Sequence, residues 1–340
     1  MKAIAAASLA VILALASTPA HALEKLSFSL ASTIDGRSGA ILLAYDRGYF
    51  KDQGIDLDIV PGNGSANVVN RLASGTFQMG SGDIASVIKF DMANPDKLVK
   101  AVYNEKLADL VIVSLKGRGI TAPTDLKGRT VGAPTGDTAY KMFGAFSTAT
   151  GVKADDIKWE HMDMTIREAM LVQGKVDAIT ASWASAFFNL KALGIPDENM
   201  VFIRYSSYGV NIVGNGWMAN ESFIKEHPDT VRKMLAAFNR GWRDTLADPN
   251  AALDSVFKRE PLLKRELELP KLLDAAASLT DQPDAKAGGF GNYSEETIKY
   301  TVGVVAAAEK TEPKIAFSDI VDLSFLPPLA ERTLPAKATH

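Results

Sequence analysis

The sequence predicts an α/β protein of two similar lobes followed by a block of helices. Short apolar segments typical of strands alternate with segments of helical periodicity from Lys25 to Tyr205, which is the rhythm of an α/β sheet. The stretches Leu72-x-x-Gly75-x-Phe77 and Leu171-x-x-Gly174-x-Val176 each join a helix end, a glycine and a strand, and their likeness favours two related lobes. After Trp217 the pattern is helical.

The first half of the chain contains regularly spaced strand and helix signals. Ile55 to Val60 alternates apolar and acidic residues with the period of two that a half-buried strand needs. Gly75 ends a helical pattern at a position where a left-handed backbone suits glycine. The expected elements are strands at 25–30, 55–60, 77–80, 98–103 and 110–115, and helices at 40–50, from 68 to Gly75, and around 84–88.

The second half repeats the scheme before it becomes helical. Pro228, Pro249 and Pro261 stand where helices are expected to begin, a position that proline favours. The expected elements are strands at 130–133, 157–160, 176–180 and 201–205, helices at 137–150, 166–173 and 182–193, and then helices at 222–226, 230–247, 251–259, 262–279 and 295–310. The last five helices are expected to pack back on the first lobe.

The N-terminus has the features of a secretory signal peptide. Lys2 is the single charged residue before Glu24, and an apolar run from Ala3 to Ala16 precedes Ala20-His21-Ala22. The run is shorter than the roughly 20 residues that a membrane-spanning helix needs, and the small residues at 20 and 22 form an A-x-A cleavage site. We therefore expect cleavage after Ala22 and export to the periplasm.

Composition narrows the class of protein. The chain has no cysteine, which excludes disulfides, thiolate metal sites, a cysteine nucleophile and the lipid-bearing cysteine of a lipoprotein. Lys and Arg total 37 against 40 Asp and Glu. This slightly acidic balance argues against a nucleic-acid partner, which selects for clustered positive charge. The 340 residues are enough for two domains once residues 1–22 are removed.

Five segments, taken in order, carry a resemblance to a known family. They are AYDRGYFKDQGI at 44–55, LASGTFQMG at 72–80, DLKGRTVG at 125–132, QGKVDA at 173–178, and HPD at 227–229 followed by AFNRGW at 237–242. Together they resemble the nitrate, taurine and sulfonate type of periplasmic solute-binding protein, a family that also includes binders of pyrimidine precursors. The resemblance covers roughly residues 25–249.

The resemblance implies a type II periplasmic binding protein fold, with two α/β lobes joined by two crossing strands and a ligand held between them. Residues 23–108 and 209–340 would form the first lobe, with the C-terminal helices packed on it, and residues 109–208 the second. The crossings are expected near 110–115 and 203–208. The lobes would close by a hinge motion. The implied partners are a small-molecule ligand and the permease subunits of an ABC importer, for a monomer without cofactor or metal.

Candidate ligand-binding residues lie where strands end and helices begin, because these loops line the cleft of such a fold. Helix N-termini suit an anionic group, and Ser and Thr add donors. Asp83 and Asp137 are expected first as helix N-caps, and Trp183 fits core packing nearly as well as stacking on a ligand. The candidates are Asp35, Arg37, Ser38, Asn63, Gly64, Ser65, Asp83, Thr135, Asp137, Thr138, Trp183, Tyr208 and Asn211.

The sequence leaves the charge of the ligand open. Arg37, which follows Gly36 in a loop, can bind a carboxylate or sulfonate through two hydrogen bonds, although a surface ion pair explains this arginine equally well. Such a contact favours a small organic anion, for example a sulfonate or an aromatic acid. Asp35, Asp83 and Asp137 in the same set of loops favour instead an amine or a pyrimidine, including a thiamine precursor.

Enzymatic functions find little support in the sequence. His161 is the one histidine outside the signal peptide, the C-terminus and the capping turn at His227, and no pair of metal ligands lies near it. A G-x-S-x-G nucleophile elbow is absent from the sequence. Fungal pyrimidine-precursor synthases of the same fold carry a cysteine-rich run beside a reactive histidine, which this chain lacks. We expect a solute-binding protein, with a sensor domain or a metabolite scavenger as the alternative.

Overall fold

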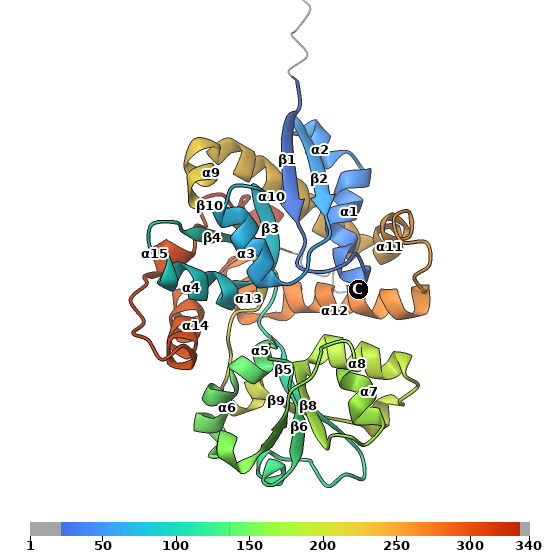
Figure 1. Cartoon of the computed structure of the whole chain (residues 1–340). Coiled ribbons are helices and arrows are strands. Elements are labelled where there is room, and N and C mark those ends of the chain that lie inside the picture. The colour runs from blue at the N-terminus through green and yellow to red at the C-terminus, as the bar shows by residue number, and fades with distance from the viewer. Residues whose placement is uncertain (1–21, 136, 334–340) are drawn as a thin grey trace, which may run out of the picture.

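The computed structural model describes residues 22–135 and 137–333, which form two lobes, each built around a five-stranded sheet (Figure 1). The first sheet lies in the upper half of Figure 1 and the second in the lower half. The predicted signal peptide falls on residues 1–22, of which 1–21 lie outside the described part of the chain. The α/β fold class is confirmed. The boundaries at 108 and 208 remain predictions.

The first sheet has the strand order β2-β1-β3-β10-β4. Strand β1 is parallel to β2 and β3, while β10 is antiparallel to both of its neighbours, β3 and β4. Its strands are β1 (Glu24–Ser29), β2 (Ile55–Val60), β3 (Met79–Asp83), β4 (Val99–Asn104) and β10 (Asn215–Asn220). Strand β10 therefore forms after the chain has passed through the second lobe, and it lies in the interior of the first sheet.

The second sheet follows the same plan, with the order β7-β6-β8-β5-β9. Strand β6 is parallel to β7 and β8, and β5 is antiparallel to β8 and β9. The strands are β5 (Leu110–Leu115), β6 (Thr130–Gly132), β7 (Lys158–Glu160), β8 (Ala178–Ser182) and β9 (Met200–Arg204). In each sheet the antiparallel strand is the one that directly follows a crossing between the lobes, β5 after the first crossing and β10 after the second.

Helices cover both sheets. The helices before the first crossing are α1 (Gly39–Asp46), α2 (Tyr49–Asp52), α3 (Ser65–Ala73) and α4 (Ile84–Ala93). Those of the second lobe are α5 (Thr138–Lys141), α6 (Phe143–Thr150), α7 (Arg167–Val172) and α8 (Trp183–Ala192). The expected helix at 40–50 is interrupted at Gly48, whose φ of 76° is left-handed. Among the described residues, none of the helices has the length and apolar composition that a membrane crossing requires.

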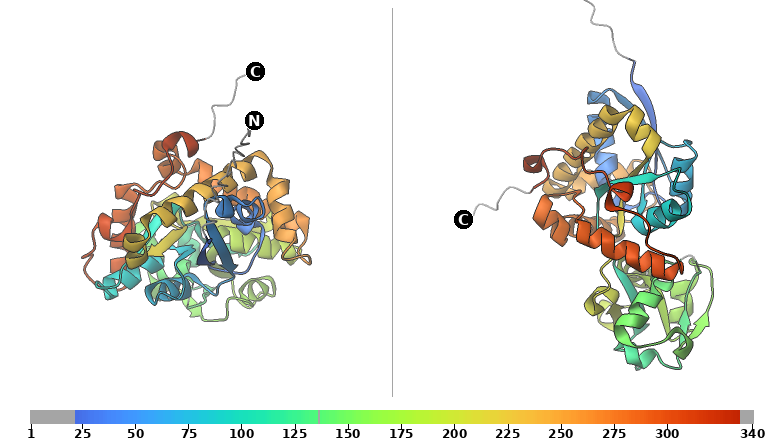
Figure 2. Two further views of the ribbon diagram at one scale, coloured as in Figure 1. Left: turned by 90° about the horizontal axis from the view of Figure 1, so that it is seen from above. Right: turned by 90° about the vertical axis from the view of Figure 1, so that its left-hand side faces the viewer.

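The C-terminal helices pack on the first lobe and also contact the second. They are α9 (Glu221–Glu226), α10 (Pro228–Ala247), α11 (Pro249–Phe257), α12 (Arg265–Asp281), α13 (Pro283–Gly288), α14 (Glu295–Ala308) and α15 (Phe317–Ile320). Helices α10 and α11 contact α1, as expected, but α12 also contacts α8, and α14 contacts α6. Figure 2 shows α14, in orange-red, along the boundary between the lobes. Val304 of α14 joins the apolar core of the second lobe.

The chain crosses between the lobes through residues 105–109 and 209–214. These two segments run antiparallel, with a bridge between Leu107 and Val213 and a 2.9 Å hydrogen bond from the Ala108 N–H to the Ile212 carbonyl. The crossings expected near 110–115 and 203–208 are therefore wrong by a few residues. Leu110–Leu115 is β5, an interior strand of the second sheet, because its continuous apolar run belongs to a core.

Candidate ligand-binding site

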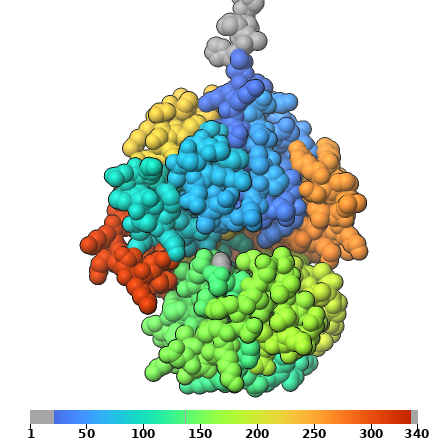
Figure 3. Space-filling view, in the orientation of Figure 1, coloured from blue at the N-terminus to red at the C-terminus, as the bar shows by residue number. Residues whose placement is uncertain are grey.

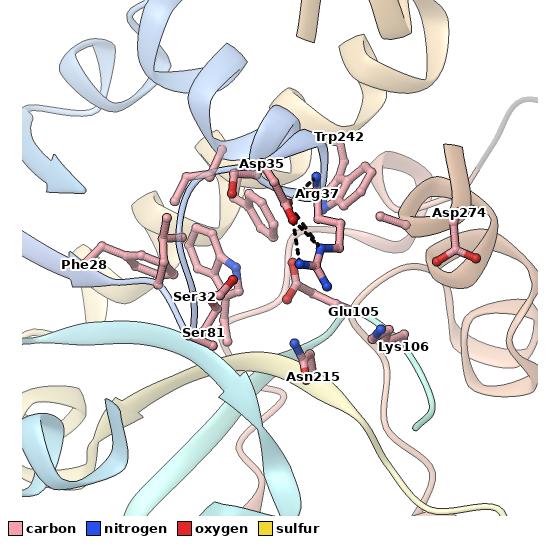
Figure 4. Close-up of a pocket in the computed structure, with 17 residues that line it drawn as sticks. Phe28, Ser32, Asp35, Arg37, Ser81, Glu105, Lys106, Asn215, Trp242 and Asp274 are labelled. Atoms are coloured by element: carbon pink, nitrogen blue, oxygen red, sulfur yellow. Dashed lines mark hydrogen bonds and ion pairs between the residues drawn. The ribbon is translucent and has the colours of Figure 1, made fainter. Parts of the chain in front are cut away.

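A pocket of about 100 Å³ opens on the side of the first lobe that faces the second lobe, beside the crossing segments (Figure 4). Figure 3 shows the furrow between the two lobes from the front. The polar loop after β1, the middle of β3, the segment after β4, and parts of β10, α10 and α12 contribute to the pocket. The lining residues are Phe28, Leu30, Ala31, Ser32, Asp35, Arg37, Ser38, Ile41, Ser81, Glu105, Lys106, Asn215, Trp217, Phe238, Trp242, Asp274 and Ala275.

Aromatic rings form one wall of this pocket. The Trp217 and Phe238 rings stack with their centroids 3.8 Å apart and their planes at 22°. The ring centroid of Phe28 lies 4.3 Å from that of Trp217, and the ring centroid of Trp242 lies 6.2 Å from that of Phe238. These four rings are almost fully buried and belong to three elements that are distant in sequence, β1, β10 and α10. The result is a tightly packed aromatic cluster at the pocket, in which Phe238 and Phe28 both lie against the Trp217 ring.

Asp35 and Arg37 form an ion pair at the mouth of the pocket. Asp35 caps the short 3₁₀ helix at Gly36–Ser38, where its carboxylate accepts a 2.9 Å hydrogen bond from the Arg37 N–H. The same carboxylate accepts two hydrogen bonds from the Arg37 guanidinium, 3.0 Å from Nε and 2.5 Å from Nη2. Burial opposes the charged form of Arg37, but the pairing with Asp35 outweighs it and raises the pKa. The positive charge of Arg37 is thus already largely neutralised.

Glu105 and Lys106 follow β4 and present opposite charges to the pocket. Within the described part of the chain, neither side chain forms an ion pair closer than 4 Å. Burial raises the pKa of Glu105 from 4.5 to about 7, and burial lowers the pKa of Lys106. Both side chains are half-buried, and both shifts are typical of charges that lack a close partner and have lost part of their contact with water. A hydrogen-bond donor is therefore the group that Glu105 lacks.

Four other predicted residues meet across the lobes instead of in this pocket. Gly64, Ser65 and Asp83 of the first lobe and Thr138 of the second line a separate pocket of about 240 Å³. Asp83 caps α4 by accepting from the Ala85 N–H at 3.0 Å, so the expected N-cap role is confirmed. Asp137 likewise caps α5, accepting from the Tyr140 N–H. Burial raises the pKa of Asp83.

The structure places the remaining candidates apart from both pockets. Trp183 stacks on Phe187, with ring centroids 4.9 Å apart, and the Arg204 guanidinium lies 4.9 Å from its ring. Tyr208 packs on Phe146 beside α14. The others, Asn63, Thr135 and Asn211, are exposed in loops. Of the thirteen candidates, the pocket of Figure 4 thus brings together Asp35, Arg37 and Ser38. No cluster among the described residues has the three ligands that a metal ion would need.

Several pocket residues were missed by reasoning from the sequence. Glu105 and Lys106 directly follow a correctly expected strand, so the rule that selects loops at strand ends would have found them. Trp217 and Phe238 carry no such signal, because an isolated aromatic residue in an apolar segment looks like any core residue. Asp274 stands in a helix far from every strand end, and tertiary packing alone brings it to the pocket.

Comparisons with known proteins agree with this architecture. The sequence profile of the family described as NMT1/THI5 like matches residues 37–252. The chain is 25% identical over 240 residues to the 4-amino-5-hydroxymethyl-2-methylpyrimidine phosphate synthase THI12 of Saccharomyces cerevisiae, covering 67% of this chain and 68% of that protein. It is 21% identical over 305 residues to the formylaminopyrimidine-binding protein of Halalkalibacterium halodurans, covering 83% and 86%. The relatives therefore include both a synthase and a binding protein.

Solved structures show the same fold. The periplasmic aliphatic sulphonate binding protein SsuA of Escherichia coli superposes with a TM-score of 0.66 at 17% identity, over 84% of this chain and 92% of that one. A sulfonate-binding SsuA from Methylobacillus flagellatus KT gives 0.67 at 16% identity, over 90% and 93%. These likenesses confirm the type II binding-protein fold expected from the sequence. Because the family profile spans well over half of its length, the chain belongs to the NMT1/THI5-like family.

Proposed function

We propose that this chain is a solute-binding protein of an ABC importer, and that its pocket in Figure 4 binds a planar, nitrogen-containing compound with a single ring. The observation that carries the proposal is the unpaired Glu105 carboxylate beside the aromatic wall of Trp217 and Phe238. A ring seated at the edge of this wall would direct an amino N–H toward Glu105. Such a charge-assisted hydrogen bond is stronger than a neutral one.

The size of the pocket supports a single ring. Its volume is about 100 Å³, which is less than the roughly 150 Å³ of an enclosed apolar cavity that accommodates benzene, so a single ring would fill the pocket and extend partly into the furrow. The pocket is open on one side, so a ring with small substituents can lie with its edge toward the furrow. A fused system of several rings would need the aromatic wall itself to move.

The charges of the pocket support a neutral or cationic solute. Asp35 neutralises Arg37, which leaves Glu105 and Asp274 against Lys106 among the charged lining residues. This excess of one carboxylate weighs against the anionic sulfonate or aromatic acid expected from Arg37. It favours the alternative expectation, a pyrimidine or an amine, because a buried carboxylate is stabilised by a donor and destabilised by a second anion.

The comparisons support the same class of compound. Two kinds of relative, a synthase and a binding protein, carry pyrimidines in their names. We assign this chain to binding and not to catalysis, because it has no cysteine and the pocket of Figure 4 contains no histidine. Export by the signal peptide at 1–22 and delivery to a permease belong to this proposal. A sensor or a scavenger would use the same pocket and differ in the partner it contacts.

A thermal-shift screen over pyrimidines, aromatic amines, sulfonates and aromatic acids tests the proposal, because a compound that binds the folded state raises the unfolding temperature. We expect 4-amino-5-hydroxymethyl-2-methylpyrimidine to raise it and taurine and benzenesulfonate to have no effect. Stabilisation by the sulfonates alone would contradict the assignment of ligand class. Conversion of the pyrimidine during the incubation, followed by chromatography, would contradict the assignment to binding.

A further inference from the structure

The C-terminal helix α12 supplies a wall of the pocket that the family match does not cover. The family profile matches residues 37–252, whereas α12 spans Arg265–Asp281 and contributes Asp274 and Ala275 to the lining. Figure 4 shows Asp274 at the opposite side of the pocket from Phe28, at its outer edge. The acidic group at this edge therefore belongs to a part of the chain beyond the segment that defines the family.

Close contacts hold α12 in place. The Gly36 N–H donates a 2.7 Å hydrogen bond to Oε2 of Glu268, which is itself buried. Lys271 binds the other carboxylate oxygen of Glu268 at 2.7 Å. A Cβ atom at Gly36 would lie 2.1 Å from the carbonyl oxygen of Glu268, so the backbones of the loop and the helix touch directly. Asp274, six residues or roughly 1.7 turns further along the helix, is thus presented on a fixed support.

Asp274 has no partner of its own. Across residues 22–135 and 137–333, no cation lies within 4 Å of its carboxylate. The neighbouring cations are Lys106, Arg37 and Arg204, but Asp35 holds Arg37 and Asp109 holds Arg204 at 2.6 Å. Lys106 must balance Glu105 as well. Burial raises the pKa of Asp274, as expected for a carboxylate with too little positive charge around it.

We propose that Asp274 determines specificity by selecting a solute that carries a protonated amine on a short substituent of its ring. This inference rests on the proposed function, since it requires a ring seated against Trp217 and Phe238. Asp274 lines the same pocket as Glu105, on the side opposite Phe28, so it would be the acidic group available to a ring substituent that points outward. An ammonium group there would neutralise the excess carboxylate of the pocket and donate a charge-assisted hydrogen bond.

The test compares two compounds that differ in one group. Calorimetric titrations of the wild type and of Asp274→Asn would use 4-amino-5-aminomethyl-2-methylpyrimidine and its 5-hydroxymethyl counterpart, which have nearly the same size. We expect the wild type to bind the amine roughly tenfold more tightly or better, and Asp274→Asn to lose most of this preference while it binds the alcohol within about threefold of the wild type. Asp281→Asn, a highly exposed residue at the end of the same helix, is the matched control and should behave as wild type.

Benzylamine and benzyl alcohol serve as a second pair that contains no pyrimidine. If neither pyrimidine binds but benzylamine binds in an Asp274-dependent manner, the proposed ligand class is overturned and the role of Asp274 stands. If the pyrimidines bind and Asp274→Asn weakens both members of a pair equally, Asp274 acts on closure of the lobes, and the inference is overturned while the proposed function survives. If no compound of either pair binds, both are overturned.

Discussion

Thr138 of the second lobe donates a 3.1 Å hydrogen bond to the carboxylate of Asp83 in the first lobe. The other oxygen of that carboxylate accepts from the Ala85 N–H and caps α4, and the Asp83 N–H donates to Ser65 Oγ at 2.9 Å. One side chain thus joins the start of a helix in each lobe. Any opening of the furrow between the lobes has to break this bond, so it stabilises the arrangement seen here relative to a more open one.

We therefore predict that Thr138→Val shifts the protein toward open conformations. The substitution keeps the shape of the side chain and removes the donor, and a hydrogen bond of this kind contributes about 0.5 to 1.5 kcal/mol. Ligand affinity should fall about two- to tenfold, because part of the binding energy must then restore closure. Small-angle scattering of the unliganded protein should show a larger radius of gyration. Thr148→Val, on the exposed side of α6, is the control, and equal behaviour of the two variants would contradict a closing role for Thr138.

Glu105 should make stability depend on pH. Its pKa is raised from 4.5 to about 7 in the folded protein, so between these values the folded state binds more protons than the unfolded state. The free energy of unfolding should therefore fall as pH rises from 5 to 8. Glu105→Gln should make the free energy of unfolding depend less on pH. At pH 8 the variant should be more stable than the wild type by on the order of 1 kcal/mol, a value that allows for solvent around the partly exposed carboxylate. Urea unfolding at several pH values measures the slope.

Asp91 provides an internal comparison for that experiment. Its pKa is also raised by burial, to about 7, and it lies in α4, away from the pocket. Asp91→Asn should also reduce the pH dependence of the free energy of unfolding, but it should not change ligand binding. Glu105→Gln should change both the pH dependence and the affinity for the ligand. If the stability of Glu105→Gln depends on pH as steeply as that of the wild type, the burial of an unpaired carboxylate in the pocket is contradicted.

Gly36→Ala should destabilise the protein and weaken binding together. The added Cβ would lie 2.1 Å from the Glu268 carbonyl oxygen, and backbone atoms on both sides leave little room for adjustment. A cost of about 1 to 3 kcal/mol in the free energy of unfolding is expected, as for other overpacked sites. Gly144→Ala is the matched control, because nothing lies within 4 Å of its added Cβ. Thermal unfolding of both variants checks this, and an unchanged Gly36→Ala protein would mean that α12 is not held against the loop.

Most elements of the fold were predictable from the sequence. The hydrophobic periodicity of each segment, the glycines that end helices and the prolines that begin them are all local signals. The strand at Ile55–Val60 was expected with its observed bounds, and Gly75 and Gly151 end helices as predicted with left-handed φ values of 74°. Strand β10 was missed, because Asn215, Gly216 and Asn220 disfavour strands. Hydrogen bonds to β3 and β4 impose the extended conformation on it, and such pairing has no local sequence signal.

The candidate site was only partly predictable, for a related reason. Residues at strand ends, such as Asp35 and Arg37, could be selected because the fold class fixes where strand ends lie. The ion pair between Asp35 and Arg37 could not be predicted, because charges two residues apart pair only when the loop turns to bring them together. Trp242 and Asp274 come from helices whose approach to the pocket depends on packing between distant segments, and no local pattern records that approach.

One calorimetric experiment tests most directly whether Glu105 accepts a hydrogen bond from a ring held against the aromatic wall. The wild type, Glu105→Gln and the control Glu312→Gln, an exposed residue far along the chain, would each be titrated with 4-amino-5-hydroxymethyl-2-methylpyrimidine at pH 8, where the Glu105 carboxyl is ionised. We predict that the wild type and the control bind alike and that Glu105→Gln binds at least about tenfold more weakly, in line with the loss of a charge-assisted hydrogen bond. Equal affinity of all three proteins, or binding of benzenesulfonate in place of the pyrimidine, would contradict the account.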